Sequence, residues 1–383
     1  MAEMNTHSET PKKLLVFMPP LTLGGMERMV VNLLNRLDRS KFSTTLVLIG
    51  SGGSDTLLQL LDEDIKVVDL GCSSLRRAIG GYIRVARQIK PDIIFSTIMH
   101  LNFAVLFTRW LVPGRPRLVA RESVFVSSHL EEMPATAMWK AATRLFYRYF
   151  DRLVCQSQAM ADDLHEAFKV PHEKLQVIHN PVDRDALVQR AEAEVGASGG
   201  WSDDGNLVAV GRLAAVKQVD GIIRAISLLG ATAPNLSIVG DGPLRQELEQ
   251  LVRSHDLGEC VTFAGEQKNP YPSMAAADAL IIGSKHEVFP NVVLEALALG
   301  KPVIATPARG GLPEILDSVD ASFVAADMTP EALAEAIRQW QLARHDISVP
   351  ADCVAAYDPA IITDQYEQAL MGELSKDKVS STR

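Results

Sequence analysis

The sequence has few cysteines, and those that it has are not grouped. The four cysteines, Cys72, Cys155, Cys260 and Cys353, are far apart and form no CxxC or CxxH motif. This scatter argues against a small zinc-binding module and against a disulfide framework. It is typical of a chain that works in a reducing cytosol.

Long apolar runs are also missing. No stretch approaches the roughly 18 consecutive apolar residues of a membrane span. The N-terminus, MAEMNTHSETPKK, is polar and carries glutamates, unlike a secretory signal. We therefore expect a cytoplasmic protein in which residues 1–12 form a disordered tail.

Charge is unevenly divided over a chain with a net charge of −9. Residues 1–185 hold 23 Lys and Arg against 20 Asp and Glu, and residues 186–383 hold 15 against 27. Such a division indicates either two halves with different partners or a drift in solvated surface charge. With 383 residues and 47% hydrophobic content, the chain is long enough for two domains.

Short apolar segments alternate with segments of helical spacing. The predicted strands are 14–18, 45–49, 65–70, 93–96, 118–120 and 152–156 in the first half, and 207–210, 236–239, 261–263, 279–282 and 302–305 in the second. Residues 26–37 and 361–374 have the apolar spacing of amphipathic helices. The alternation predicts two doubly wound α/β domains with parallel sheets. Ligands of such sheets bind at the carboxyl ends of the strands, so we expect the site in a cleft between the halves.

The segment from about 182 to 206 interrupts this pattern. It is rich in Gly, Ser and Asp and has little apolar periodicity. Such a composition is typical of a linker or an exposed inter-domain segment. We place the domain boundaries around it, with one domain over 13–185, a second over 186–360, and a terminal helix and tail over 361–383.

Residues 283–300, GSKHEVFPNVVLEALALG, contain the strongest candidate for a binding site. Pro290 suits the first turn of a helix, and Gly300 suits its end. The backbone N–H groups of Phe289, Asn291 and Val292 would then lie at the positive end of the helix dipole. Such a helix start binds phosphate groups.

Two glutamates flank this expected phosphate site, eight positions apart. A carboxylate aimed at the phosphate would be repelled, so both need other partners. Glu295 suits ribose hydroxyls, and Glu287 suits the hydroxyls of a sugar beyond the pyrophosphate. The alternative for Glu295 is an exposed helix carboxylate, but its neighbours are apolar and a charge there needs a partner.

This stretch resembles the donor-site signature of glycosyltransferase family 4, a family of retaining enzymes with the GT-B fold. The resemblance covers about residues 13 to 374. Its segments are PPLTLGGMERMVVNLLNRL (19–37), HNPVD (179–183), GRLAAVKQVD (211–220), VGDGPLRQELEQ (239–250), HEVFPNVVLEALALGKPVIAT (286–306) and GGLPE (310–314). It implies two Rossmann-like domains that face each other across a cleft, with the C-terminal helix returning to the N-terminal domain.

The resemblance also implies roles for residues of the donor site. Arg212 and Lys217 would neutralise the pyrophosphate as its bond to the sugar breaks, and together with Glu287 they are the catalytic candidates. Gly24 and Gly25 would face the donor phosphate and the acceptor. Val288 stands where glycine is frequent in the family, and its backbone N–H is a further donor contact.

One part of VGDGPLRQELEQ also has a superficial likeness to a dinucleotide fingerprint. Arg245 stands in place of its third glycine, which gives hydride chemistry little support. We interpret Gly240 and Gly242 as turn formers.

The N-terminal half departs from the family at the acceptor side. Where many members carry a histidine near the end of a strand, LVARESVF (118–125) has Arg121, Glu122 and Ser123. We keep His100, Arg121 and Glu122 as acceptor-side candidates, although a lone histidine is more often structural.

We therefore expect a retaining, metal-independent glycosyltransferase of polysaccharide or lipopolysaccharide biosynthesis. It would move a hexose or N-acetylhexosamine from a nucleotide-diphosphate sugar, UDP- rather than GDP-linked, to a glycan or lipid-linked acceptor. No cofactor, metal or nucleic acid is expected, because no DxD-type acidic pair stands where a metal would bridge the phosphates. Two alternatives stay open: a GT-B sugar-nucleotide epimerase, and a catalytically silent binding protein on the same fold.

Residues 138–153, MWKAATRLFYRYFDRL, bear on the membrane. Lys140, Arg144, Arg148 and Arg152 recur at i, i+4 steps, which predicts a cationic stripe along one helix beside aromatic faces. Such a helix fits peripheral association with an anionic membrane, here the cytoplasmic face of the inner membrane. The alternative is an ordinary domain helix with a wet basic face.

Overall fold

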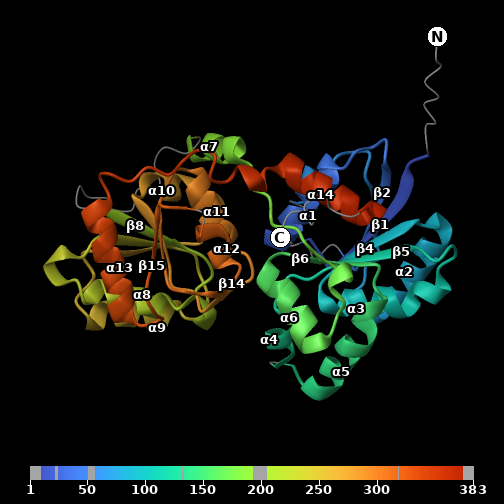
Figure 1. Ribbon diagram of the computed structural model, residues 1–383, viewed down its shortest axis with the longest axis horizontal. Helices are drawn as coiled ribbons and strands as arrows, with labels where there is room; N and C mark the ends of the chain where they lie inside the picture. Colours follow the sequence, from blue (N-terminus) through green and yellow to red (C-terminus); the bar gives the residue numbers. More distant parts are fainter. Residues whose placement is uncertain are drawn as a thin grey trace, which may run out of the picture. The chain divides into compact units, whose positions relative to one another are not determined.

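The chain forms two compact units (Figure 1). The computed structural model describes residues 10–21, 25–50, 57–131, 133–192, 205–317 and 319–373. The first unit runs to Asn180 and resumes at Pro359, and the second is Pro181–Asp358. From the sequence, these divisions were expected after Asp185 and after Ala360. The expected tail falls largely on residues 1–9, which lie outside the described residues, and the first strand begins at Lys12.

The first unit is built on a parallel sheet of seven strands. In chain order they are β1 (Lys12–Met18), β2 (Phe42–Leu48), β3 (Lys66–Asp69), β4 (Ile93–Thr97), β5 (Arg117–Arg121), β6 (Arg152–Cys155) and β7 (Leu175–Val177). Their order across the sheet is β3-β2-β1-β4-β5-β6-β7. The direction of winding therefore reverses between β1 and β4, which is where open α/β sheets bind ligands.

Helices cover both faces of this sheet (Figure 1). They are α1 (Gly25–Arg36), α2 (Leu75–Ile89), α3 (Met99–Thr108), α4 (Val126–Glu131), α5 (Thr136–Phe146), α6 (Gln158–Phe168) and the returning α14 (Pro359–Met371). Leu14 and Val16 of β1 belong to the same buried cluster as side chains of α1 and α14. Phe17, the residue after Val16, stacks on Tyr82 of α2 with ring centroids 4.5 Å apart. Every core residue of β1 is thus buried on one face or the other, which explains its continuous apolar run.

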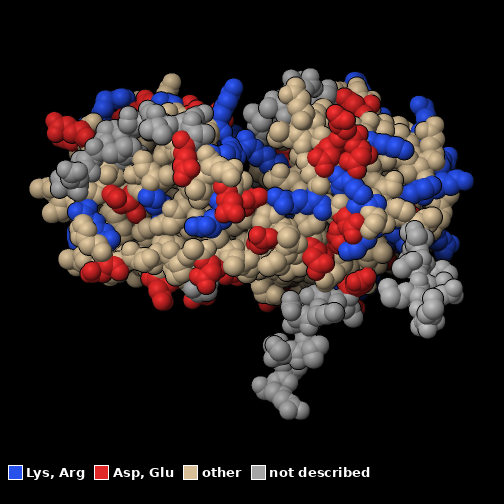
Figure 2. All heavy atoms as spheres, turned by 90° about the horizontal axis from the view of Figure 1, so that it is seen from above, with Lys and Arg blue, Asp and Glu red and all other residues tan. Residues whose placement is uncertain are grey.

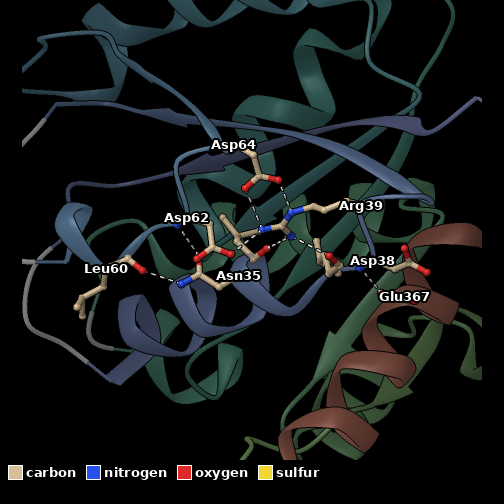
Figure 3. A network of polar contacts seen from close by, with 9 residues as sticks. Asn35, Asp38, Arg39, Leu60, Asp62, Asp64 and Glu367 are labelled. Carbon is tan, nitrogen blue, oxygen red and sulfur yellow. Dashed lines mark hydrogen bonds and ion pairs between the residues drawn. The ribbon is translucent and has the colours of Figure 1, made fainter.

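The C-terminal helix α14 returns to the first unit, as predicted. The Asp38 N–H donates to Glu367 Oε1 at 2.8 Å, and Lys41 Nζ lies 2.6 Å from Glu367 Oε2. Figure 3 shows this junction beside a second cluster, in which the Arg39 guanidinium bonds to Asp62 and Asp64. The end of α1 is therefore tied both to α14 and to the loop before β3.

The second unit contains a parallel sheet of six strands. They are β8 (Asn206–Val210), β9 (Asn235–Val239), β10 (Val261–Gly265), β11 (Ala279–Ile282), β13 (Val303–Ala305) and β15 (Ser322–Val324), in the order β10-β9-β8-β11-β13-β15. A two-residue parallel pair joins β12 (His286–Glu287) to β14 (Arg309–Gly310). Winding reverses between β8 and β11.

Helices again cover both faces of the second sheet (Figure 1). They are α7 (Arg184–Glu192), α8 (Val219–Ser227), α9 (Arg245–Ser254), α10 (Tyr271–Ala276), α11 (Asn291–Ala298), α12 (Leu312–Leu316) and α13 (Pro330–Ala343). Leu207 and Ala209 belong to the core cluster that holds α8 and α13, whereas Val208 belongs to the cluster that holds α11. This alternation is the period of a strand buried on both sides.

The predicted cationic helix over 138–153 is wrong. Helix α5 ends at Phe146, and a 3₁₀ turn over Tyr147–Tyr149 follows it. Arg152 lies in the buried strand β6, where its guanidinium donates to the Glu173 carbonyl at 2.8 Å. The four cations therefore do not form one stripe, because the chain must turn before Arg152 to enter the sheet.

The prediction of a linker over 182–206 is also wrong in part. Residues 184–192 form α7, whose Leu187 is buried in the second unit. Residues 193–204, which carry most of the Gly, Ser and Asp, lie outside the described residues. The short strands β7 and β15 were not predicted, because three residues are too few to show a strand period.

No helix in the described part of the chain is long and apolar enough to cross a membrane. On the face shown in Figure 2, Lys and Arg side chains lie among Asp and Glu side chains in both units. On that face, the uneven charge of the two halves does not produce a surface of one sign.

Candidate active site

The second sheet brings Arg212, Lys217 and Glu287 to its carboxyl edge. Arg212 and Lys217 follow β8, and Glu287 follows β11, the neighbouring strand at the reversal of winding. A small cavity of about 20 Å³ lies between the two loops, lined by Arg212, Lys217, Gly283 and Ser284, among others. These residues therefore meet where a doubly wound sheet binds its ligand.

Lys217 and Glu287 form an ion pair. Lys217 Nζ lies 2.6 Å from Glu287 Oε1, and Glu287 is only 8% exposed. The Glu287 backbone is held by the β12–β14 pair and by the Gly311 N–H, which donates to the Glu287 carbonyl at 2.9 Å. The bond to Lys217 uses one carboxylate oxygen and one of three ammonium protons, so each group can also bind a substrate.

A larger pocket of about 510 Å³, which shares Arg212 with the small cavity, lies at the ends of β8, β9 and β10. It is lined by Val210, Gly211, Arg212, Val239, Gly240, Asp241, Gly242, Glu266, Gln267 and Pro270. Its volume is in the range of pockets that hold nucleotide-sized ligands. The exposed Arg212 side chain borders both this pocket and the smaller cavity.

Gly240 and Gly242 allow the loops behind this pocket to touch. A Cβ on Gly240 would lie 1.9 Å from the Gly211 carbonyl oxygen, and one on Gly242 would lie 2.5 Å from the Leu213 oxygen. Gly240 also has a φ of +142°, which disfavours any other residue. The two glycines therefore do more than form turns, because they set how closely the β8 and β9 loops approach.

The predicted helix start at 290 is displaced by one residue. Pro290 caps α11, which begins at Asn291, and the Val293 N–H donates to the Pro290 carbonyl at 3.1 Å. The Phe289 ring is buried and lies 5.7 Å from the Tyr357 ring, so that side chain anchors the helix start. Val288 and Val292 are half-buried.

Glu295 is half-buried in the second turn of α11. The Tyr271 hydroxyl donates to Glu295 Oε1 at 3.3 Å, and the Arg190 guanidinium lies over the Tyr271 ring at 4.5 Å. The Glu295 carboxylate, whose neighbours in sequence are apolar, therefore has a hydrogen-bond partner. Tyr271 was not predicted as a site residue, because nothing near it in sequence indicates a contact with α11.

Ser284 was also not predicted. It is fully buried, lines the small cavity beside Lys217, and its Oγ has no hydrogen-bond partner among the described residues. A buried hydroxyl without a partner is costly. A GS pair directly after a buried strand was the only signal available in the sequence.

In the first unit, Arg121 and Glu122 are not on the surface. Their exposed fractions are 1% and 0%. The prediction that these two side chains contact the acceptor is therefore wrong, because buried side chains cannot touch a substrate. Their positions at the end of a strand were inferred correctly, but burial decides their function.

Arg121 instead bonds to the places where the chain leaves and re-enters the first unit. Its guanidinium donates to Asn180 Oδ1 at 2.8 Å, to the Tyr366 hydroxyl of α14 at 3.0 Å and to Ser123 Oγ at 3.1 Å. Asn180 donates in turn to Gln156 Oε1 at 3.0 Å. One buried side chain thus holds the last residue of the outgoing chain and the returning helix.

Glu122 extends this buried network toward β4. Its Oε1 accepts from the Tyr147 hydroxyl at 2.6 Å and from Asn102 Nδ2 at 2.7 Å, while Oε2 has no partner among the described residues. Ser96 Oγ donates to Asn102 Oδ1 at 2.7 Å. Burial raises the pKa of Glu122 to about 7, against the lowering effect of these two donors.

His100 is exposed in the first turn of α3, next to the end of β4. Its ring lies 6.5 Å from the His129 ring and 5.8 Å from the Trp139 ring. Burial of part of the ring, and then the charge of His129, lower the pKa of His100. Gly25 begins α1 and is exposed, and Gly24 lies outside the described residues.

Among the described residues, no three His, Cys, Asp or Glu side chains gather as they would around a metal ion. At the carboxyl edge of the second sheet, the two cations and Glu287 are a set suited to a diphosphate and to hydroxyl groups, beside the further polar residues Asp241, Glu266, Gln267 and Ser284.

Two family models match the chain. The model of glycosyltransferase family 4 matches residues 23–186, and that of the group 1 glycosyl transferases matches residues 204–341. The lipopolysaccharide core biosynthesis glycosyltransferase LpsD of Rhizobium meliloti is 30% identical over 302 residues, which are 76% of this chain and 77% of LpsD.

Another relative, from Campylobacter jejuni, is an N-acetylgalactosamine-N,N'-diacetylbacillosaminyl-diphospho-undecaprenol 4-alpha-N-acetylgalactosaminyltransferase. It is 27% identical over 316 residues, which are 79% of this chain and 83% of that protein. Among solved structures, Anabaena HepE in complex with UDP superposes with a TM-score of 0.77 at 21% identity, covering 94% of this chain and 99% of HepE. The likeness to HepE shows that the fold is shared.

Proposed function

The chain belongs to glycosyltransferase family 4, and we propose that it is a retaining, metal-independent member whose donor is a UDP-sugar. Its fold is GT-B, and its function is glycosyl transfer from a nucleotide sugar in polysaccharide or glycolipid biosynthesis. The transferred group would be a hexose or N-acetylhexosamine, and the acceptor a hydroxyl of a glycan or a lipid-linked saccharide. The observation that carries this proposal is the Lys217–Glu287 pair beside Arg212 at the reversal of winding in the second sheet.

The donor site follows from the chemistry of these residues. The uridine and ribose would occupy the pocket of about 510 Å³, with the diphosphate toward Arg212 and Lys217. Glu295 would accept hydrogen bonds from ribose hydroxyls, and Glu287 from hydroxyls of the sugar. The backbone N–H groups at the start of α11 would add to the positive potential at the phosphate.

In the reaction, the bond from the anomeric carbon to the β-phosphate oxygen breaks, and negative charge builds up on that oxygen. Arg212 and Lys217 would stabilise this charge in the transition state. The acceptor hydroxyl attacks from the same face, its oxygen bonds to the anomeric carbon, and its proton passes to the departing phosphate oxygen. This scheme needs no protein base. The burial of Glu122, which keeps its carboxyl away from an acceptor, is consistent with it.

The choice of UDP and of a lipid-linked acceptor is supported by relatives. HepE was solved with UDP and with UDP-glucose, and the Campylobacter jejuni relative is named for a diphospho-undecaprenol acceptor. A lipid-linked acceptor would bring the protein to the cytoplasmic face of a membrane, so peripheral membrane association is part of the proposal.

The first test is a thermal-shift panel of UDP-, GDP- and ADP-sugars, each with and without EDTA. A ligand at ~100-fold excess over its Kd stabilises a protein by about 2.7 kcal/mol, which is readily detected. We expect a shift with a UDP-sugar that EDTA does not change. A shift that requires a divalent cation, or one seen only with GDP- or ADP-sugars, would contradict the proposal.

A second measurement separates the alternatives. The protein is incubated with the UDP-sugar that it binds, with and without a mixture of saccharide acceptors, and the products are analysed by NMR. Transfer with retained anomeric configuration is expected. Conversion of the donor alone into another sugar nucleotide would indicate an epimerase, and binding without any product would indicate a silent binding protein.

A further inference from the structure

Two segments of the first unit carry cations and no acidic residues. Residues 107–116, FTRWLVPGRP, contain Arg109 and Arg115, and residues 136–149, TAMWKAATRLFYRY, contain Lys140, Arg144 and Arg148. The wider span 75–150 holds 12 Lys and Arg against 4 Asp and Glu, in a chain with a net charge of −9. This part of the first unit is therefore basic within an acidic protein.

The two segments pack together, although they are far apart in sequence. The rings of Phe107 and Phe146 lie 4.8 Å apart, and the Arg109 guanidinium donates to the Tyr149 carbonyl at 3.4 Å. From the end of α2, Arg87 donates to the Leu111 carbonyl at 2.8 Å. The 3₁₀ turn Arg109–Leu111 thus joins α2 to the end of α5.

Large apolar side chains on these segments face solvent. Trp110 is 73% exposed, Tyr149 56%, and Phe107 and Leu145 52% each. Leu111, beside Trp110, is exposed as well. Single exposed apolar residues need no explanation, but these five, with Met138 at 59% as a sixth on the same two packed segments, indicate a surface that meets an apolar partner.

Cations border these five side chains. The Arg115 guanidinium lies over the Trp110 ring at 4.9 Å. Arg144 and Arg148 are exposed and make no ion pair among the described residues, whereas Arg109 is paired with Asp151 and Lys140 with Glu131. Three cations are therefore available to an anionic partner.

We propose that Phe107, Trp110, Leu111, Leu145 and Tyr149, with Arg115, Arg144 and Arg148, form a docking surface for an anionic lipid bilayer. Aromatic side chains with a polar edge sit at the level of the lipid headgroups. Arginines are attracted to anionic headgroups within a Debye length, about 8 Å at physiological ionic strength. The surface offers both features and has no carboxylate within its two segments to oppose them.

This surface differs from the predicted cationic helix. Arg152 is buried in β6 and takes no part, and the cations come from two segments rather than from one helix. The docking surface also lies entirely within the first unit, whereas Arg212, Lys217 and Glu287 belong to the second. Donor binding and membrane binding can therefore be lost separately.

The test is co-sedimentation of the full chain with vesicles of phosphatidylcholine alone or mixed with phosphatidylglycerol. We expect binding to the mixed vesicles only, and we expect it to weaken as salt is raised. Arg144→Glu with Arg148→Glu should reduce partitioning at least about tenfold, since each cation near an anionic membrane contributes measurably to binding. The matched control is Arg224→Glu with Arg253→Glu, which makes the same change of charge at exposed arginines of the second unit.

The apolar contribution is tested with Trp110. Trp110→Ala should weaken binding to mixed vesicles, while Leu342→Ser, at a residue 85% exposed in the second unit, should not. Trp110→Phe should keep the binding but lose most of the change in tryptophan fluorescence on adding vesicles. All variants should retain the thermal shift with a UDP-sugar, so a failure of the proposed function would be seen separately.

Equal binding to neutral vesicles, no binding to either kind, or wild-type binding by the Arg144 and Arg148 variant would overturn the proposal. Binding to neither kind would instead favour an acidic protein as the partner of this surface.

Discussion

The carboxyl edges of the two sheets place charged residues at similar positions and use them differently. At the second edge, Arg212 borders both pockets, Lys217 borders the smaller one, and the buried Glu287 pairs with Lys217. At the first edge, Arg121 ends β5 and Glu122 follows it, and both are sealed among hydrogen-bonding side chains. A charge at a strand end can therefore serve a ligand only where a pocket reaches that charge or its ion-pair partner.

Removal of Arg121 should have the largest effect on the buried edge of the first sheet. Arg121→Met should destabilise the fold by about 3–5 kcal/mol, because Asn180, Tyr366 and Ser123 lose a buried charged donor. Denaturant unfolding measures the change. The matched control is Arg224→Met, at an exposed arginine whose replacement should change stability by less than ~0.5 kcal/mol.

Folded Arg121→Met should still show the thermal shift with a UDP-sugar. Loss of that shift at a temperature where the variant is folded would mean that Arg121 serves the donor after all.

Arg212→Met should have the opposite pattern. We expect turnover to fall about 10²–10³-fold, the effect of removing one donor that stabilises charge in a transition state. Unfolding should be unchanged, because the Arg212 side chain is exposed. Initial rates with a UDP-sugar donor measure the loss, with Arg224→Met again as control, and wild-type turnover would remove Arg212 from the site.

The buried carboxyl of Glu122 predicts a pH dependence of stability. Its pKa is raised to about 7 in the folded protein, mainly by burial, against about 4.5 when unfolded. The folded state therefore binds more protons between these values, so the stabilisation present below pH ~4.5 is lost as the pH rises through about 7. The loss should be on the order of 3 kcal/mol.

Glu122→Gln removes this titration and keeps the shape of the side chain. Unfolding free energies of wild type and variant, measured from about pH 5 to 8, should diverge in favour of the variant as the pH rises. Parallel curves would show that Glu122 does not titrate in this range.

The smallest effect expected is that of Tyr271→Phe. The hydroxyl of Tyr271 holds Glu295, which we assign to the donor ribose. Its loss should weaken binding of a UDP-sugar about fivefold, because the change removes one hydrogen bond that positions Glu295 and no direct contact to the donor. Calorimetric titration measures this Kd. An unchanged Kd would show that the hydrogen bond from Tyr271 to Glu295 does not contribute to donor affinity.

Much of the second edge could be predicted from the sequence because its signals are local. The spacing of Glu287 and Glu295 around Pro290 indicated a helix start between two carboxylates, and α11 begins at Asn291. Arg212 and Lys217 follow a buried strand directly, so their place at a strand end was also evident. Their assignment to donor and catalysis stays a prediction.

The first edge was predicted less well. Glu122 also follows a strand, but Tyr147 and Asn102, which cover it, come from other helices. The stripe over 138–153 failed for a related reason, since helical spacing continues in the sequence after the chain has turned toward β6.

Local sequence patterns are enough to infer the alternation of strands and helices, the family, and the residues that stand at strand ends. These depend on side-chain period and on short motifs, which act between neighbours along the chain. The folded structure was needed to show that Lys217 pairs with Glu287, that Arg121 holds the returning helix α14, and that the segments of Trp110 and Arg144 pack together. Each of these depends on contacts between residues distant in sequence, and no local pattern specifies which side chains such contacts bury.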